Sequence, residues 1–101
     1  MIARLWRGAV RPGHGDAYAQ YLDRTGVPDC RATPGNRGVS VLRRDLPDRT
    51  EFVFISFWES MQAIRAFAGD EVERARYYPE DREFLLELEP NVAHYEVAGG
   101  R

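Results

Sequence analysis

The sequence contains no lysine, and all fourteen of its basic residues are arginines. Schiff-base chemistry on a lysine side chain is therefore excluded, and the N-terminal amine is the one ordinary primary amine. Cys30 is the single cysteine, so no internal disulfide can form, which favours a reducing cytoplasm. The two histidines are widely separated and the acidic residues are scattered without ligand spacing, so we expect no metal site.

Long hydrophobic runs and an excess of positive charge are also absent. The longest apolar stretch, residues 52–58, is too short for a transmembrane helix, and arginines inside the first apolar segment argue against a signal peptide. A net charge of -2 supplies no basic field for nucleic acid. No nucleotide, phosphate-loop or serine-hydrolase motif is present. With 101 residues, 44% hydrophobic and 30% charged, the chain is expected to be one soluble globular domain, residues 1–101.

Proline and glycine divide the chain into short elements. Alternating patterns predict strands at residues 2–10, 38–46, 50–58 and 91–97. Apolar stripes predict a helix at residues 16–26, a second after the N-cap Ser60 and ending at Gly69, and a short third from Asp70 towards Tyr77 and Tyr78. Residues 27–38 are expected to form a long turn-rich loop. Residues 84–88 are ambiguous between helix, strand and packed loop.

The order of these elements, β-α-β-β-α-β, predicts an α+β, ferredoxin-like fold with a four-stranded antiparallel sheet and helices on one face. In the strand at residues 50–58 both alternating sets are apolar, although a sheet with one covered face should alternate apolar and polar residues. Something must therefore cover the second face. A second copy packed sheet to sheet, in a symmetric homodimer, is the favoured explanation; the alternative is that residues 84–88 fold across this face.

A distinctive pattern runs from the third strand into the second helix. It comprises Phe52-Val53-Phe54-Ile55-Ser56-Phe57-Trp58-Glu59-Ser60, then Gln62-Ala63-Ile64-Arg65-Ala66-Phe67, and finally His94-Tyr95-Glu96-Val97. It resembles the antibiotic-biosynthesis-monooxygenase superfamily over nearly the whole chain, residues 2–97. The resemblance implies a dimeric α+β barrel with a pocket between sheet and helices in each subunit. The superfamily includes cofactor-independent oxygenases of polycyclic quinols and anthrones and haem-degrading monooxygenases, so the fold alone does not fix a reaction.

In the superfamily that the chain resembles, the haem-degrading branch has a pattern of Asn on the first strand, Trp late in the second helix and His about ten residues later. Those three places correspond here to Trp6, Phe67 and Tyr77, and all three differ from the pattern. Haem degradation is therefore disfavoured, and no cofactor is expected. The quinol-oxidising branch uses less fixed polar and aromatic residues, so it is not excluded by this comparison.

Cofactor-free oxygenation requires a protein to bind an electron-rich aromatic, deprotonate it and stabilise the anion while oxygen attacks. Aromatic side chains that could wall such a pocket are Trp6, Phe54, Trp58, Phe67, Tyr77 and Tyr78. Core packing is the simpler interpretation for Phe54 and Phe67. Arg4 shares a strand face with Trp6, and it could either hold a phenolate or carboxylate or pair with Glu96 across the sheet.

His94 is the one histidine within a predicted strand and the natural candidate for a catalytic base. The hydroxyl of Tyr77 or Tyr78 could hold a substrate oxygen, and we expect one of these two side chains to be packed and the other to face the pocket. Cys30 lies in a predicted loop with no placed histidine, which makes it a weak candidate for a nucleophile.

The sequence therefore predicts a small homodimeric protein that oxidises a hydroxylated aromatic or polyketide-type substrate without a cofactor. The expected catalytic residues are His94 and Tyr77. The expected substrate-binding residues are Arg4, Trp6, Trp58, Phe67 and Tyr78. One alternative is a non-catalytic module of the same fold that binds a small apolar ligand or serves in assembly, and another is an isomerase or decarboxylase that uses the same pocket.

Overall fold

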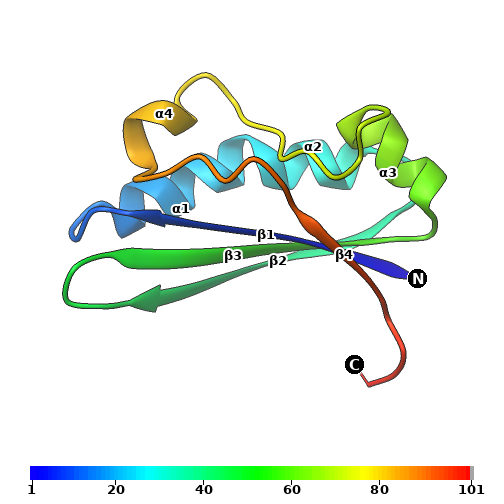
Figure 1. Ribbon diagram of the computed structural model, residues 1–101, viewed down its shortest axis with the longest axis horizontal. Coiled ribbons are helices and arrows are strands. Elements are labelled where there is room, and N and C mark those ends of the chain that lie inside the picture. Colours follow the sequence, from blue (N-terminus) through cyan, green and yellow to red (C-terminus); the bar gives the residue numbers. More distant parts are fainter. Residues whose placement is uncertain (101) are drawn as a thin grey trace.

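The computed structural model describes residues 1–100, which form one four-stranded antiparallel sheet with all helices on one face (Figure 1). The strands are β1 (Ile2–Val10), β2 (Asn36–Asp45), β3 (Thr50–Trp58) and β4 (Ala93–Glu96), and their order across the sheet is β2-β3-β1-β4. The helices are α1 (Gly15–Arg24), α2 (Gly26–Ala32), α3 (Met61–Ala68) and α4 (Asp81–Phe84). The predicted α+β, ferredoxin-like fold is confirmed.

The helix-facing side of the sheet carries the core. Alternation along β1 and β3 places Val10, Phe52 and Trp58 under the helices, and each is at most 1% exposed. Tyr18 and Tyr21 from α1 pack over one end of the sheet, and Ile64 from α3 packs over the other. No helix among residues 1–100 is long and apolar enough to cross a membrane.

The prediction of a loop over residues 27–38 is wrong, because α2 occupies the first half of this segment and β2 begins at Asn36. Pro28 lies in the first turn of this helix, where the missing amide hydrogen would have no helical acceptor. The side chains of Val27 and Cys30 are buried against the sheet and stabilise α2. Gly26 lies so close to Phe54 that an added Cβ would come within 3.3 Å of its ring, which explains the glycine at the junction of α1 and α2.

The short helix expected after Asp70 is also wrong. Residues 70–78 contain no helix; they form a turn and then an irregular segment that pairs with the residues before β4 through an isolated bridge between Arg74 and Asn91. Main-chain carbonyls that a helix would have used internally accept hydrogen bonds from distant groups instead. Those of Val72 and Arg74 accept from the Arg4 guanidinium, and that of Glu73 accepts from the amide of Val92. Tertiary contacts thus override the local preference.

The ambiguous segment at residues 84–88 begins at the last residue of α4 and then returns along β1. Leu85 forms a bridge with Val10, and the amide of Leu86 donates to the carbonyl of Ala9 over 2.9 Å. Phe84 and Leu85 pack into the core under the helices with Tyr18 and Tyr21. These two side chains therefore do not cover the open face of the sheet, which was the alternative to a dimer.

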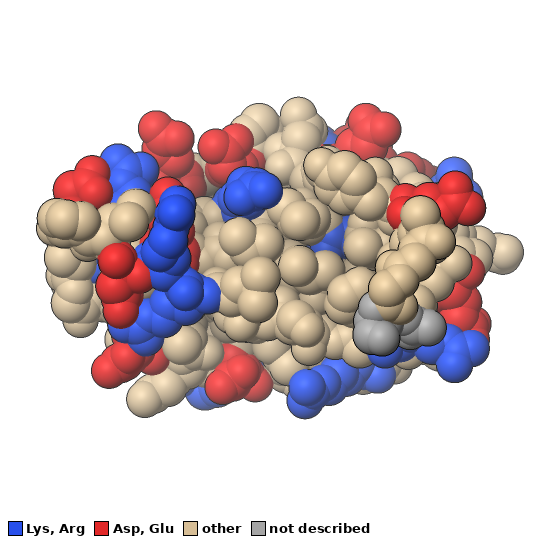
Figure 2. All heavy atoms as spheres, turned by 90° about the horizontal axis from the view of Figure 1, so that it is seen from below, with Lys and Arg blue, Asp and Glu red and all other residues tan. Residues whose placement is uncertain are grey.

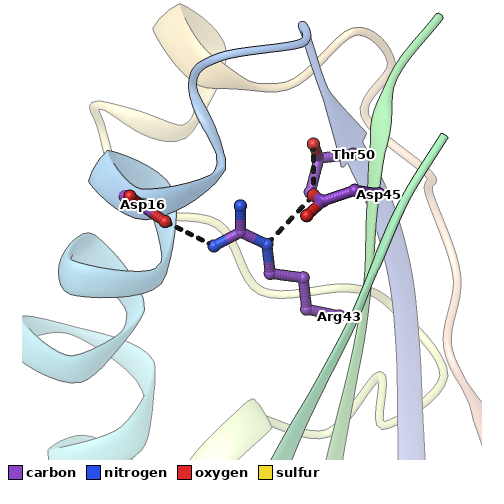
Figure 3. Close-up of polar contacts among 4 residues, drawn as sticks. All are labelled: Asp16, Arg43, Asp45 and Thr50. Atoms are coloured by element: carbon purple, nitrogen blue, oxygen red, sulfur yellow. Dashed lines mark hydrogen bonds and ion pairs between the residues drawn. The ribbon is translucent and has the colours of Figure 1, made fainter. Parts of the chain in front are cut away.

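Arg43 fastens α1 to the β2–β3 hairpin (Figure 3). Its Nη1 donates to Asp16 Oδ1 over 2.6 Å at the start of α1, and its Nε donates to Asp45 Oδ1 over 3.1 Å. Thr50 donates to the same Asp45 oxygen over 2.9 Å, and these two donors lower the pKa of the Asp45 carboxyl. Since Asp16, Arg43 and Asp45 are solvent-exposed, their ion pairs orient the helix start more than they stabilise the fold.

Candidate functional site

A small pocket lies between the helix-facing side of the sheet and the helices, with a volume of about 60 Å³. It is lined by strand residues Arg4, Trp6, Phe54 and Ser56, by helix residues Tyr18, Leu22, Gly26, Phe67 and Asp81, and by Arg76, Tyr77, Tyr78 and Val92 from the irregular segments before α4 and β4. Arg4, Trp6, Phe67, Tyr77 and Tyr78, five of the seven site residues expected from the sequence, meet here. Trp58 and His94 do not line it.

Aromatic rings form the walls of the pocket. The Trp6 ring lies 6.2 Å from that of Tyr77, nearly edge to face, and 6.5 Å from that of Tyr18. Trp6 Nε1 donates to the Tyr77 hydroxyl over 3.0 Å, and that hydroxyl donates in turn to the carbonyl of Glu89. This chain of hydrogen bonds fixes the indole between β1 and the segment before β4, so the wall is held in place from both sides.

Arg4 places a buried positive charge at the pocket. It is only 5% exposed, and no carboxylate of residues 1–100 forms an ion pair with it. The suggested pair with Glu96 is wrong, because Glu96 lies opposite Ile2 and His94 lies opposite Arg4. The guanidinium donates to two main-chain carbonyls, and burial lowers its pKa. A buried cation satisfied only by neutral acceptors leaves a site suited to an anion.

His94 lies behind Arg4 rather than in the pocket. Arg4 Nη1 is 3.1 Å from His94 Nε2, an arrangement in which the neutral ring accepts the hydrogen bond and carries its own proton on Nδ1. Burial, and next the charge of Arg4, lower the pKa of His94, while Glu73 raises it. The role of His94 as a catalytic base stays a prediction, and the observed position is one that orients Arg4.

Tyr18 and Asp81 form a buried pair that the sequence did not single out. The Tyr18 hydroxyl donates to Asp81 Oδ1 over 2.9 Å, and Asp81 Oδ2 accepts from the amide of Tyr78 over 2.7 Å. Asp81 is 3% exposed and forms no ion pair within the described chain; burial raises its pKa despite these hydrogen bonds. Asp81 is the first residue of α4, whose N-cap is Glu80, and its bond to the Tyr78 amide belongs to the turn before the helix, so no motif in the sequence marks it.

The remaining expected residues differ in their surroundings. Trp58 is fully buried, its Nε1 donates to Ser56 Oγ over 2.8 Å, and its ring packs 5.5 Å from that of Phe67. It supports the wall without reaching the pocket. Tyr77 and Tyr78 both line the pocket, so the expectation that only one would do so is wrong. The hydroxyl of Tyr78 donates to Asp29 on α2.

The residues fit a haem group poorly. Trp6, Phe67 and Tyr77, which hold the three places of the haem-degrading pattern, do meet at the pocket. However, the oxygen of Tyr77, the one potential iron ligand among them, already accepts from Trp6 and donates to Glu89. A volume of about 60 Å³ is also far too small for a porphyrin. Among residues 1–100 no cluster of three or more metal-ligating side chains occurs.

Comparison with known proteins supports this description of the fold. A family model described as antibiotic biosynthesis monooxygenase matches residues 1–75. A putative antibiotic biosynthesis monooxygenase from Bacillus cereus superimposes with a TM-score of 0.68 at 18% identity, over 99% of this chain and 93% of that one. The NE2512 protein of unknown function from Nitrosomonas europaea gives 0.69 at 21% identity, over 99% and 91%. No curated protein matches the sequence.

A third similar structure is a point mutant of MhuD with two manganese protoporphyrin IX molecules bound per active site. Its TM-score is 0.62 at 17% identity, and the alignment covers 100% of this chain and 98% of that chain. Identities this low establish a shared fold and leave the chemistry to be argued from the site.

Proposed function

Because the chain belongs to the antibiotic biosynthesis monooxygenase family, we propose that its pocket binds a hydroxylated aromatic compound and that the protein oxidises it with dioxygen, without a cofactor. The observation that carries this proposal is the meeting of aromatic walls with the uncompensated guanidinium of Arg4 in one buried pocket. Aromatic walls suit a flat ring, and a fixed positive charge stabilises the negative charge that spreads over the ring and its substituents when the ring's hydroxyl loses its proton.

The chemistry needs no external reductant. The deprotonated ring attacks dioxygen through a ring carbon and forms a peroxide; loss of water then leaves a quinone. One oxygen atom enters the product and the other leaves as water, and the aromatic substrate supplies all four electrons. The protein's part is to position the ring, accept the proton and hold the anion. Arg4 supplies the positive charge, and Trp6 and Phe67 face the ring.

Oxygen consumption tests this proposal most directly. Purified protein is mixed with a panel of mono- and dihydroxylated aromatics in an oxygen electrode, and products are analysed by mass spectrometry after reaction under ¹⁸O₂. We expect uptake with at least one compound and a product that has gained one labelled oxygen and lost two hydrogens. The absence of uptake across the panel, or a product without label, would contradict the proposal. Protein treated with a metal chelator is the control for catalysis by traces of metal.

A second candidate function is a non-catalytic module that binds a small aromatic ligand. It is favoured by one observation: the hydroxyls of both Tyr77 and Tyr78 already donate to protein acceptors, to Glu89 and Asp29 respectively. Neither hydroxyl is then an unused donor for a reacting oxygen. Binding of an aromatic without oxygen uptake, in the same samples, would favour this candidate over the oxygenase.

We infer as well that two copies pack through the open face of the sheet. Val53, Ile55 and Phe57 alternate with the buried residues of β3 and therefore lie on the face opposite the helices. On the same face, Leu42 is 51% exposed and Tyr95 is 59% exposed. Figure 2 shows that the middle of this face is mostly uncharged and that charged side chains gather towards its ends. An apolar face with a charged rim is typical of a homodimer interface.

A further inference from the structure

The pocket has two chemically different ends, and they constrain what can bind. We propose that its substrate is an aromatic acid with a hydroxyl group across the ring, whose carboxylate lies at Arg4 and whose hydroxyl faces the Tyr18–Asp81 pair. The inference deepens the proposed function by naming the substrate class. Its reaction step depends on that function, but its binding step does not.

Sheet geometry separates the two ends. Arg4 lies opposite Ser56, and Trp6 lies opposite Phe54 on the same face. Two residues along a strand span about 7 Å, so the guanidinium end and the indole are neighbours along the direction of β1. Further along β1 in the same direction, the Trp6 ring packs against the ring of Tyr18, and the Tyr18 hydroxyl is hydrogen-bonded to Asp81. A ligand lying along β1 would therefore have Arg4 at one end, Trp6 beside its ring and Tyr18 at the other end.

The Arg4 end of the pocket is suited to an anionic group because its guanidinium is charged, buried and without a carboxylate partner. Its hydrogen bonds within residues 1–100 use Nη1 and Nη2 towards Val72, Arg74 and His94, and none uses Nε. A guanidinium has five N–H donors, so two remain for a ligand. The Arg76 guanidinium also lines the pocket, 4.8 Å from the centre of the Phe67 ring, but it is paired with Asp29 over 3.5 Å, so Arg4 is the cation left for an anionic ligand.

The Tyr18–Asp81 end of the pocket is suited to a ligand group that donates a hydrogen bond, such as a hydroxyl. The Tyr18 oxygen donates its hydrogen to Asp81 Oδ1 and keeps lone pairs that can accept from a ligand hydroxyl. When the ligand loses its proton to the Tyr18 oxygen, the Tyr18 hydrogen passes to Asp81, so the proton count balances and Asp81 ends neutral. The turn before α4 uses only the other carboxylate oxygen, Oδ2, which accepts from the Tyr78 amide. This turn alone therefore does not account for the bond to Tyr18.

The space between the two ends limits the ligand to one ring inside the pocket. The volume of about 60 Å³ is less than half of the roughly 150 Å³ of an apolar cavity that admits benzene. One ring already requires side chains to move apart, and any further ring would lie at the mouth. The ring that enters must then present its carboxylate and its hydroxyl on opposite sides.

Three matched ligands test the binding step on the intact protein: 4-hydroxybenzoate, benzoate, which lacks the hydroxyl, and phenol, which lacks the carboxylate. Affinities are measured by calorimetry at constant ionic strength. We expect 4-hydroxybenzoate to bind at least about tenfold more tightly than phenol, as expected for a hydrogen-bonded charge pair. We expect it to bind a few-fold more tightly than benzoate, because of one neutral hydrogen bond.

Variants assign each preference to its end of the pocket. Arg4→Gln should remove the preference for 4-hydroxybenzoate over phenol, and Arg4→Lys should restore part of that preference. Asp81→Asn should reduce the preference over benzoate and leave the preference over phenol intact. If Arg4→Gln does not fold, the comparison of the three ligands on the unmodified protein still decides.

The outcomes separate this inference from the proposed function. Equal affinities for the three ligands, or no binding of any of them, overturn the inference whether or not oxygen is consumed. Oxygen uptake that occurs only with neutral phenols overturns it and leaves the oxygenase standing. The expected order of affinities without any oxygen uptake supports it and overturns the oxygenase.

Discussion

The Arg4 guanidinium and the His94 imidazole face each other across the β1–β4 pair, with 3.1 Å between Nη1 and Nε2. The charge of Arg4 disfavours a second charge on the ring, and burial acts in the same direction, so the pKa of His94 is lowered in the folded protein. Glu73 opposes this shift without cancelling it. The pair therefore links the stability of the fold to pH.

The first prediction concerns acidification. Below the ordinary histidine pKa of about 6.5 the unfolded chain takes up a proton on His94 that the folded protein does not, so stability falls as the pH drops from about 7.5 to 5.5. His94→Gln should flatten this part of the stability curve. Urea unfolding of both proteins between about pH 5.5 and 7.5 gives the difference in their free energies of unfolding, in which the contributions of the other titrating groups cancel. Parallel curves for the two proteins would show that His94 does not titrate differently on folding.

The second prediction concerns Gly8, which lies under the Trp6 ring. A Cβ at this position would lie 2.1 Å from Trp6 Cη2, so Gly8→Ala must displace the indole and break its bond to Tyr77. We expect a destabilisation of about 1–3 kcal/mol together with a shift in tryptophan fluorescence. Gly99→Ala is the matched control, because nothing lies within 4 Å of its added Cβ. Gly8→Ala should destabilise a Trp6→Leu variant less than it destabilises the unmodified protein. An equal destabilisation in both would mean that the added methyl group does not clash with Trp6.

The features of the fold that depend on local patterns could be predicted from the sequence. Strand alternation correctly placed Arg4 and Trp6 on one face, and the order of the elements correctly predicted a four-stranded antiparallel sheet with helices on one face. Five expected site residues reached the same pocket because they lie on regular elements or next to a proline that fixes the chain.

The failures all involve contacts between distant parts of the chain. Residues 70–78 have helical capping signals, but Arg4, about seventy residues earlier, takes up the carbonyls of Val72 and Arg74. Asp81 became visible as a site residue only through Tyr18, 63 positions away. Such partners leave no periodic pattern, so local propensity could not reveal them.

A third prediction follows from the position of Cys30, which is fully buried in the core beside Arg4. Burial raises the pKa of its thiol to about 11, although Arg4 and Ser56 oppose the shift. At pH 8 little thiolate is present and the sulfur is inaccessible, so the native protein should resist iodoacetamide while the urea-unfolded protein is labelled completely. Mass spectrometry measures the extent of labelling. Rapid labelling of the native protein would mean that α2 opens readily from the sheet.

The fourth prediction tests the open face of the sheet through charge. Ile55 lies at the centre of β3 on the side away from the helices, opposite Leu5 on one neighbouring strand and Ser40 on the other. Ile55→Arg would place a charge in the proposed interface, where the partner sheet would have to desolvate it. We expect the dimer to dissociate at micromolar concentration while the circular dichroism spectrum is retained, as followed by native mass spectrometry. Gln62→Arg, on the exposed side of α3, adds the same charge outside the face and should leave the dimer intact. A monomeric unmodified protein, or an Ile55→Arg variant that stays dimeric, would require another explanation for the apolar side of β3.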